Sequence, residues 1–85
     1  MHAAKRLEQR NISILDVIQC INNGEIIEQY PNDYPYPSCL ILGISINNKI
    51  LHTVIGSDLS YIWIITAYYP DPNKWESDFK TRKEV

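Results

Sequence analysis

The spacing of apolar residues along the chain changes at Gly24. Before this residue, four apolar residues recur three or four positions apart and line one side of a predicted helix; they are Ile14, Val17, Ile18 and Ile21. Ser13 and Asp16, three positions apart, form a capping-box pattern at the start of this helix. The pattern predicts a helix that begins after Ser13 and ends at Gly24.

A further helix is predicted upstream, over residues 2–10, because this stretch is rich in strong helix formers. Asn11 suits the left-handed backbone conformation that often ends a helix. The two helices are therefore expected to follow one another through a tight turn.

Four later runs are rich in β-branched and other apolar residues and predict strands over residues 25–30, 39–45, 49–55 and 61–68. Asn47 and Asn48 separate the second run from the third, which indicates a hairpin. If this turn has two residues, Gly43 lies opposite His52 and leaves space beside the imidazole, for a ligand or a neighbouring side chain.

Asp71 and Pro72 form a helix-start signal after the last strand, and Trp75 and Phe79 are expected to dock onto the sheet. The whole chain, residues 1–85, is thus predicted to be a single α+β domain. Two N-terminal helices would pack on a four-stranded antiparallel sheet, followed by a short C-terminal helix. The central strands are apolar on both faces, so the second face is expected to be covered by the C-terminal helix, a partner protein or a second copy.

Composition supports a small folded domain: 45% of the 85 residues are hydrophobic and 21% are charged. No apolar run reaches the length of a membrane span, and no signal peptide is recognisable, so a cytoplasmic protein without a membrane segment is expected. The two cysteines are expected to be reduced. Cys20, Cys39, His2 and His52 contain no closely spaced ligand pair, so no metal site is expected.

The net charge of −2 conceals an uneven distribution. Residues 1–12 carry a charge of +2, residues 13–73 carry −5 and residues 74–85 carry +1. His2, Arg6 and Arg10 recur every four positions, so they form one stripe along the first helix and are suited to binding a phosphate. The alternative is a solvated helix face that pairs with nearby glutamates, and spacing alone favours this second interpretation.

Two residues of the later strands are further candidates. His52 lies within an apolar strand, where it either faces a ligand or is hydrogen-bonded in the core. Tyr68 ends the last strand, where it can orient a phosphate or stack on a base, or simply pack among aromatic residues.

Four short motifs occur in order along nearly the whole chain, at residues 2–13, 23–30, 51–52 and 66–70. Together they resemble the bacterial domain-of-unknown-function family 4258. The resemblance implies a distant relation to RelE, barnase and colicin-type nucleases, in which helices precede a four-stranded antiparallel sheet. It therefore implies a toxin-like endoribonuclease that needs neither metal nor cofactor.

The expected site residues are His52, His2 and Tyr68 as catalytic groups, and Arg6, Arg10 and Lys5 as substrate-binding groups. The expected partners are RNA and an antitoxin or a second copy of the chain. The alternative is a non-enzymatic protein-interaction or homodimerisation module that uses the apolar sheet face and the loop at residues 34–37.

Overall fold

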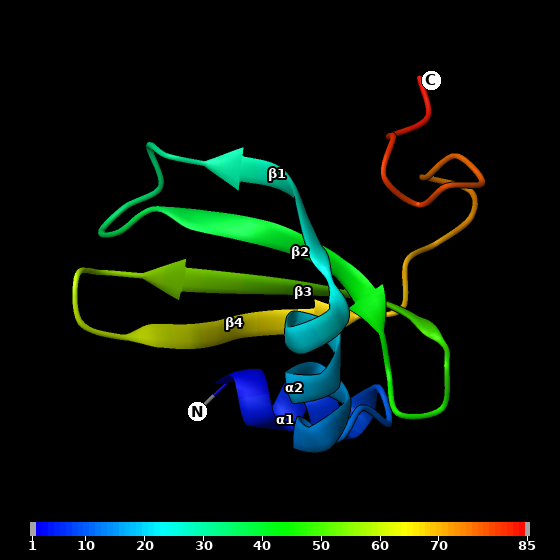
Figure 1. Ribbon diagram of the computed structural model, residues 1–85, viewed down its shortest axis with the longest axis horizontal. Coiled ribbons are helices and arrows are strands. Elements are labelled where there is room, and N and C mark those ends of the chain that lie inside the picture. The colour runs from blue at the N-terminus through cyan, green and yellow to red at the C-terminus, as the bar shows by residue number, and fades with distance from the viewer. Residues whose placement is uncertain (1, 85) are drawn as a thin grey trace.

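Two helices precede the sheet in the computed structural model, which describes residues 2–84 and, of residues 2 and 3, the backbone only (Figure 1). Helix α1 spans His2–Gln9 and helix α2 spans Ile14–Asn23. Asn11 between them has a φ of 58°, as predicted for a residue that ends a helix. Among the described residues, no helix is long and apolar enough to cross a membrane.

The predicted capping box at the start of α2 is confirmed. The Ser13 hydroxyl accepts a hydrogen bond from the Asp16 backbone N–H at 3.1 Å, and the Asp16 carboxylate accepts one from the Ser13 N–H at 2.9 Å. These two bonds satisfy backbone donors that the first turn of a helix leaves free.

Four antiparallel strands follow the helices and form one sheet in the order β1-β2-β3-β4. Strand β1 spans Glu25–Tyr30, β2 spans Ser38–Ile44, β3 spans Ile50–Ser57 and β4 spans Ile62–Tyr68. The pairing of β1 with β2 shifts between Ile26 and Glu28, and that of β3 with β4 shifts between Val54 and Ile55. The predicted α+β architecture of two helices and a four-stranded sheet is confirmed.

Both helices pack on the same face of the sheet, α1 against β4 and α2 against β2 and β3 (Figure 1). The core between them is apolar and consists of Leu7, Ile12, Val17, Cys20, Ile41, Leu51, Ile55 and Ala67. Gly43 lets α2 approach closely, because a Cβ atom at this position would lie 2.4 Å from the Cys20 carbonyl oxygen. We call this side of the sheet the helix face.

The predicted register of the hairpin between β2 and β3 is wrong by one residue. Leu42, and not Gly43, lies opposite His52, and Gly43 pairs with Leu51 on the helix face. The turn contains three residues between Ser45 and Lys49, and its last residue, Asn48, has a φ of 59°. One left-handed asparagine at the end of a three-residue turn replaces the expected two-residue turn.

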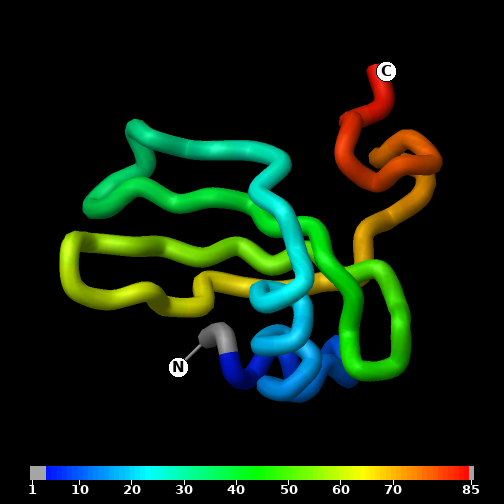
Figure 2. Tube along the Cα trace, in the orientation of Figure 1, coloured from blue at the N-terminus to red at the C-terminus, as the bar shows by residue number. Residues whose placement is uncertain are grey.

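The predicted C-terminal helix is also wrong. Residues 70–84, which we call the C-terminal strap, contain one turn after Asp71 and then an isolated bridge between Trp75 and Arg82. The Asp78 carboxylate accepts hydrogen bonds from two following backbone N–H groups, and Phe79 has a φ of 57°, so the chain reverses where a helix would continue. The strap runs from the end of β4 to the level of β1 (Figure 2).

Candidate functional site

His52 lies near the middle of β3, on the face of the sheet opposite the helices. Its neighbours Leu51 and Thr53 contact α2, because Cys20 donates to the Leu51 carbonyl and Thr53 donates to the Cys20 sulfur, so alternation along the strand turns His52 the other way. The His52 side chain has no exposed surface. We call this side the strap face.

The hydrogen bond of His52 defines its tautomer. Nε2 lies 2.8 Å from the carbonyl oxygen of Phe79, which can only accept, so Nε2 carries the proton and Nδ1 holds the lone pair. Nδ1 is buried and has no hydrogen-bond partner among the described residues. Burial lowers the pKa of His52, although the Phe79 carbonyl partly opposes this shift. The imidazole is therefore neutral at neutral pH.

Tyr68 and Trp75 surround the His52 ring. Tyr68 is the direct cross-strand neighbour of His52, with 5.4 Å between ring centroids, and the Trp75 ring centroid lies 4.6 Å away. Both contacts are edge-to-face arrangements that aromatic rings favour. Burial raises the pKa of Tyr68, so its hydroxyl stays protonated. The structure thus brings together two of the residues predicted from the sequence.

Arg10, the residue directly after α1, reaches the end of β4 next to Tyr68. Its Nη1 donates to the Thr66 hydroxyl and to the Ala67 carbonyl, both at 2.9 Å. These residues directly precede Tyr68, and the positive charge of Arg10 partly opposes the rise in the Tyr68 pKa. Of the predicted stripe, Arg10 is therefore bound to the end of β4, just beyond the last residue of α1.

The remaining predicted residues lie in α1. Arg6 and Lys5 have exposed side chains, and no ion pair links them to another described residue. The side chain of His2 lies outside the described part of the chain. Their predicted roles remain predictions.

Three residues of the strap face were missed by the sequence analysis as site candidates. Arg82 binds the Glu28 carboxylate through two hydrogen bonds, Nε to Oε2 at 2.8 Å and Nη2 to Oε1 at 2.9 Å. The Tyr30 hydroxyl donates to the same carboxylate. Glu28 and Tyr30 are two positions apart in a strand, which places them on one face and could have singled them out. Arg82 follows Glu28 by 54 residues, so no local pattern could have joined it to them.

The charges of this group stabilise one another. Hydrogen bonding to Arg82 is the main reason that the pKa of Glu28 is lowered, and the same contact raises the pKa of Arg82. Burial, together with the hydrogen bond to Glu28, raises the pKa of Tyr30 to about 12. Glu28 and Arg82 therefore remain charged and Tyr30 remains neutral at neutral pH.

An apolar groove of about 990 Å³ lies away from this cluster. It is bordered by α1, by the start of α2, by the turn after β2 and by Trp63 of β4. Neither His52 nor Tyr68 lines it. The chemically reactive side chains and this apolar groove are thus separate features.

Metal-binding side chains are dispersed over the described residues. No group of three or more His, Cys, Asp or Glu side chains among them is arranged to hold a metal ion. Cys20 and Cys39 are both free thiols, and burial raises the pKa of each. These two cysteines are therefore protonated at neutral pH.

Comparison with known protein families gives a match. A family model described as Domain of unknown function (DUF4258) matches residues 1–69. No curated protein and no solved structure matches the chain. The matched region includes both helices and the whole sheet and stops one residue after β4, so the C-terminal strap lies outside it.

Proposed function

This chain belongs to the family Domain of unknown function (DUF4258), and within that family we propose that it acts as a metal-independent endoribonuclease of the toxin type. The observation that supports this proposal is the contact between His52 and Tyr68, with Arg10 bound to the two residues before Tyr68. An imidazole and a phenol are thus in contact across β3 and β4, and a guanidinium is hydrogen-bonded to the two residues that precede the phenol. These are groups that transfer protons and bind phosphates.

In the proposed reaction, His52 removes the proton from an RNA 2′-hydroxyl. The 2′-oxygen attacks the adjacent phosphorus and forms a 2′,3′-cyclic phosphate, while the bond to the 5′-oxygen breaks. The leaving 5′-oxygen takes its proton from water, and His52 then releases the proton it accepted to solvent. Arg10 and Arg6 neutralise the phosphate, and Tyr68 orients it or stacks on a base. The lone pair on Nδ1 suits His52 for the first of these steps.

Burial limits this reaction in the conformation described. Because His52 has no exposed surface, the residues that cover it must move before RNA can reach Nδ1. The net charge of −2 also predicts weak binding, since RNA affinity grows with the number of phosphates that basic residues neutralise. We therefore expect slow cleavage by the wild-type protein.

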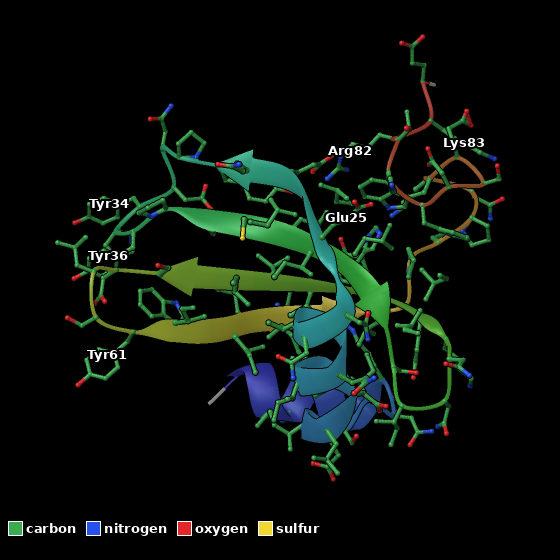
Figure 3. The ribbon with its side chains drawn as sticks, viewed as in Figure 1. Glu25, Tyr34, Tyr36, Tyr61, Arg82 and Lys83 are labelled. Carbon is green, nitrogen blue, oxygen red and sulfur yellow. The ribbon has the colours of Figure 1, made fainter. Side chains whose placement is uncertain are left out.

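The test is incubation of purified protein with RNA in excess chelator, with long time courses. His52→Gln should reduce cleavage by about 10²- to 10⁴-fold, which is the usual contribution of a general base. Tyr68→Phe should reduce it less. Tyr61→Phe is the matched control, because Tyr61 is exposed and lies at the end of the sheet away from the strap (Figure 3). This variant should cleave RNA at the wild-type rate. Intact RNA throughout, or equal cleavage by His52→Gln, would contradict the proposal.

A second candidate function is homodimerisation. The observation that favours it is a group of exposed side chains at the end of the sheet away from the strap. Tyr34 and Tyr36 in the loop after β1 and Tyr61 in the turn after β3 lie at the same end of the sheet (Figure 3). The side chain of Tyr34 is 96% exposed. Leu59, which lies in the same turn as Tyr61, is fully exposed. Exposed aromatic and apolar side chains at one place are typical of a protein interface.

Light scattering coupled to size exclusion tests this second candidate directly. We expect a mass that rises with protein concentration toward that of a dimer, and Tyr34→Ser with Leu59→Ser should return it to the monomer. Lys49→Ser, in the turn after β2, is the control at a distant turn. A strict monomer over the whole concentration range would exclude the dimer.

A further inference from the structure

The C-terminal strap leaves β4 and reaches the level of β1 beside one end of the sheet (Figures 1 and 2), and its residues contact His52 of β3 and Glu28 of β1. We infer that the strap is an intramolecular cover of the His52 site, and that the ion pairs holding it to β1 control access to that site. Its effect on catalysis rests on the proposed nuclease function. Its effect on the exposure of His52 does not.

Two strap residues cover His52 directly. Trp75, which is only 4% exposed, lies with its ring edge-to-face against the imidazole. The Phe79 carbonyl accepts the hydrogen bond from Nε2. The Phe79 carbonyl thus occupies Nε2, and the Trp75 ring covers part of the imidazole. A reagent or substrate can therefore reach this part of His52 only after the strap has moved away.

Two basic residues of the strap fasten it to β1. Arg82 binds Glu28 in a two-pronged contact and lies over the Trp75 ring, with 4.7 Å from Cζ to the ring centroid. Lys80 forms a second ion pair, with Glu25. Figure 3 shows Glu25 on β1 close to Arg82, while Lys83 lies farther out along the strap.

The two ion pairs that hold the strap to β1 are weak interactions. The Arg82 and Glu28 side chains are 60% and 23% exposed, and exposed ion pairs contribute little free energy. The strap has one isolated bridge, between Trp75 and Arg82, and no helix or longer strand of its own. It is therefore expected to open locally while the helix face stays folded.

Phe79 adds a reason for the strap to open. Its φ of 57° is a left-handed conformation that a bulky side chain rarely adopts and that costs free energy. This conformation accompanies the hydrogen bond from His52 to the Phe79 carbonyl. Release of the strap relieves the strain and frees Nε2 in one step.

The experiment compares two charge reversals on neighbouring strap residues, Arg82→Glu and Lys83→Glu. The readouts are the rate at which diethyl pyrocarbonate modifies His52, mapped by mass spectrometry, and amide hydrogen exchange along the chain. Arg82→Glu should raise the rate at His52 and the exchange of strap amides by about tenfold or more, because the pair with Glu28 becomes a repulsion. Lys83→Glu, whose side chain has no ion pair with a described residue, should leave both rates at the wild-type value.

Reversing the pair supplies a further control. Glu28→Arg combined with Arg82→Glu restores opposite charges and should return the His52 rate toward that of the wild type. Unchanged exchange of the amides in α2 and β2 would show that Arg82→Glu has not unfolded the chain. Rapid modification of His52 in the wild type, or equal rates of His52 modification in Arg82→Glu and Lys83→Glu, would contradict the proposal that the strap covers His52.

RNA cleavage by the same variants separates the two proposals. Faster modification of His52 together with faster cleavage by Arg82→Glu supports both. Faster modification without any cleavage supports the cover and overturns the nuclease function. Equal cleavage by the wild type and Arg82→Glu, with His52 protected in each, overturns the cover and leaves the nuclease function standing.

Discussion

On one face of the sheet two helices bury an apolar core, whereas on the other a segment with almost no regular structure covers a histidine. The helix face is closed by side chains such as Val17 and Leu51, which have no exposed surface. The strap face is closed by one buried tryptophan, one hydrogen bond to a backbone carbonyl and two ion pairs at the edge.

The two faces therefore have different roles: the helix face determines the stability of the fold, and the strap face determines access to His52. Burial of apolar surface is the main source of folding free energy and is lost only when the core opens. Partly exposed ion pairs contribute little, and they can exchange with water while the core remains intact. We therefore expect changes on the helix face to affect the whole fold and changes on the strap face to act locally.

Gly43→Ala should have the largest effect on stability, because it forces α2 away from the sheet. The new Cβ would lie 2.4 Å from the Cys20 carbonyl, a backbone atom that cannot move without moving the helix. We expect a loss of about 3 kcal/mol in the free energy of unfolding, measured by urea denaturation.

Gly56→Ala is the matched control for Gly43→Ala. A Cβ at this position would meet the Trp63 ring at 2.5 Å, and a side chain of an edge strand can rotate away. The loss in the free energy of unfolding should be clearly smaller for Gly56→Ala than for Gly43→Ala. Equal losses for the two glycines would mean that close packing of α2 is not what Gly43 provides.

Trp75→Ala is expected to have the next largest effect, confined to the strap. A fully packed aromatic residue replaced by alanine usually costs 3–5 kcal/mol, but here the strap can detach instead of leaving a cavity. We expect a loss of at most about 2 kcal/mol, with fast amide exchange over residues 70–84 and wild-type exchange in β2. Uniformly faster exchange in both regions would place Trp75 in the same cooperative unit as the helix face.

The smallest effect concerns the pH dependence of stability. The pKa of His52 is lowered from its ordinary value of 6.5, so between these two pKa values the unfolded chain binds a proton that the folded chain does not. The free energy of unfolding should therefore be fully retained above pH 6.5 and should fall as the pH drops below it, by at most about 1.4 kcal/mol per pH unit. His52→Gln should abolish this part of the slope. Identical profiles of the wild type and His52→Gln between pH 7 and pH 5 would contradict the burial of His52.

Much of the fold could be predicted because its signals are local. The capping box of Ser13 and Asp16, the left-handed Asn11 and the β-rich runs each act within a few residues. The start signal at Asp71 was also read locally, but a start signal does not supply the tertiary contacts that a short helix requires. Here Trp75 and Arg82 pair with each other and contact the sheet instead.

The candidate site was predictable only where residues share an element or a register. His52 and Tyr68 were singled out by residue type, and they meet because β3 and β4 are adjacent. The neighbour of His52 on β2 was predicted wrongly, since one extra residue in the turn shifts the register. Glu28 and Arg82 lie 54 residues apart in the sequence, and only the path of the strap brings them together.

The shift in β1 has a consequence for how the strap is fastened. Glu25 and Glu28 are three positions apart, so in a regular strand they would point to opposite sides of the sheet. The bulge adds Ile27, so that Glu25 pairs with Leu42 and Glu28 pairs with Leu40, two residues on one side. Both carboxylates thus face the strap because of one inserted residue. If the same residues formed a regular strand without the bulge, every charge in the chain would be kept, but one of the two carboxylates would turn away from the strap. The bulge in this edge strand therefore decides whether both ion pairs of the strap can form.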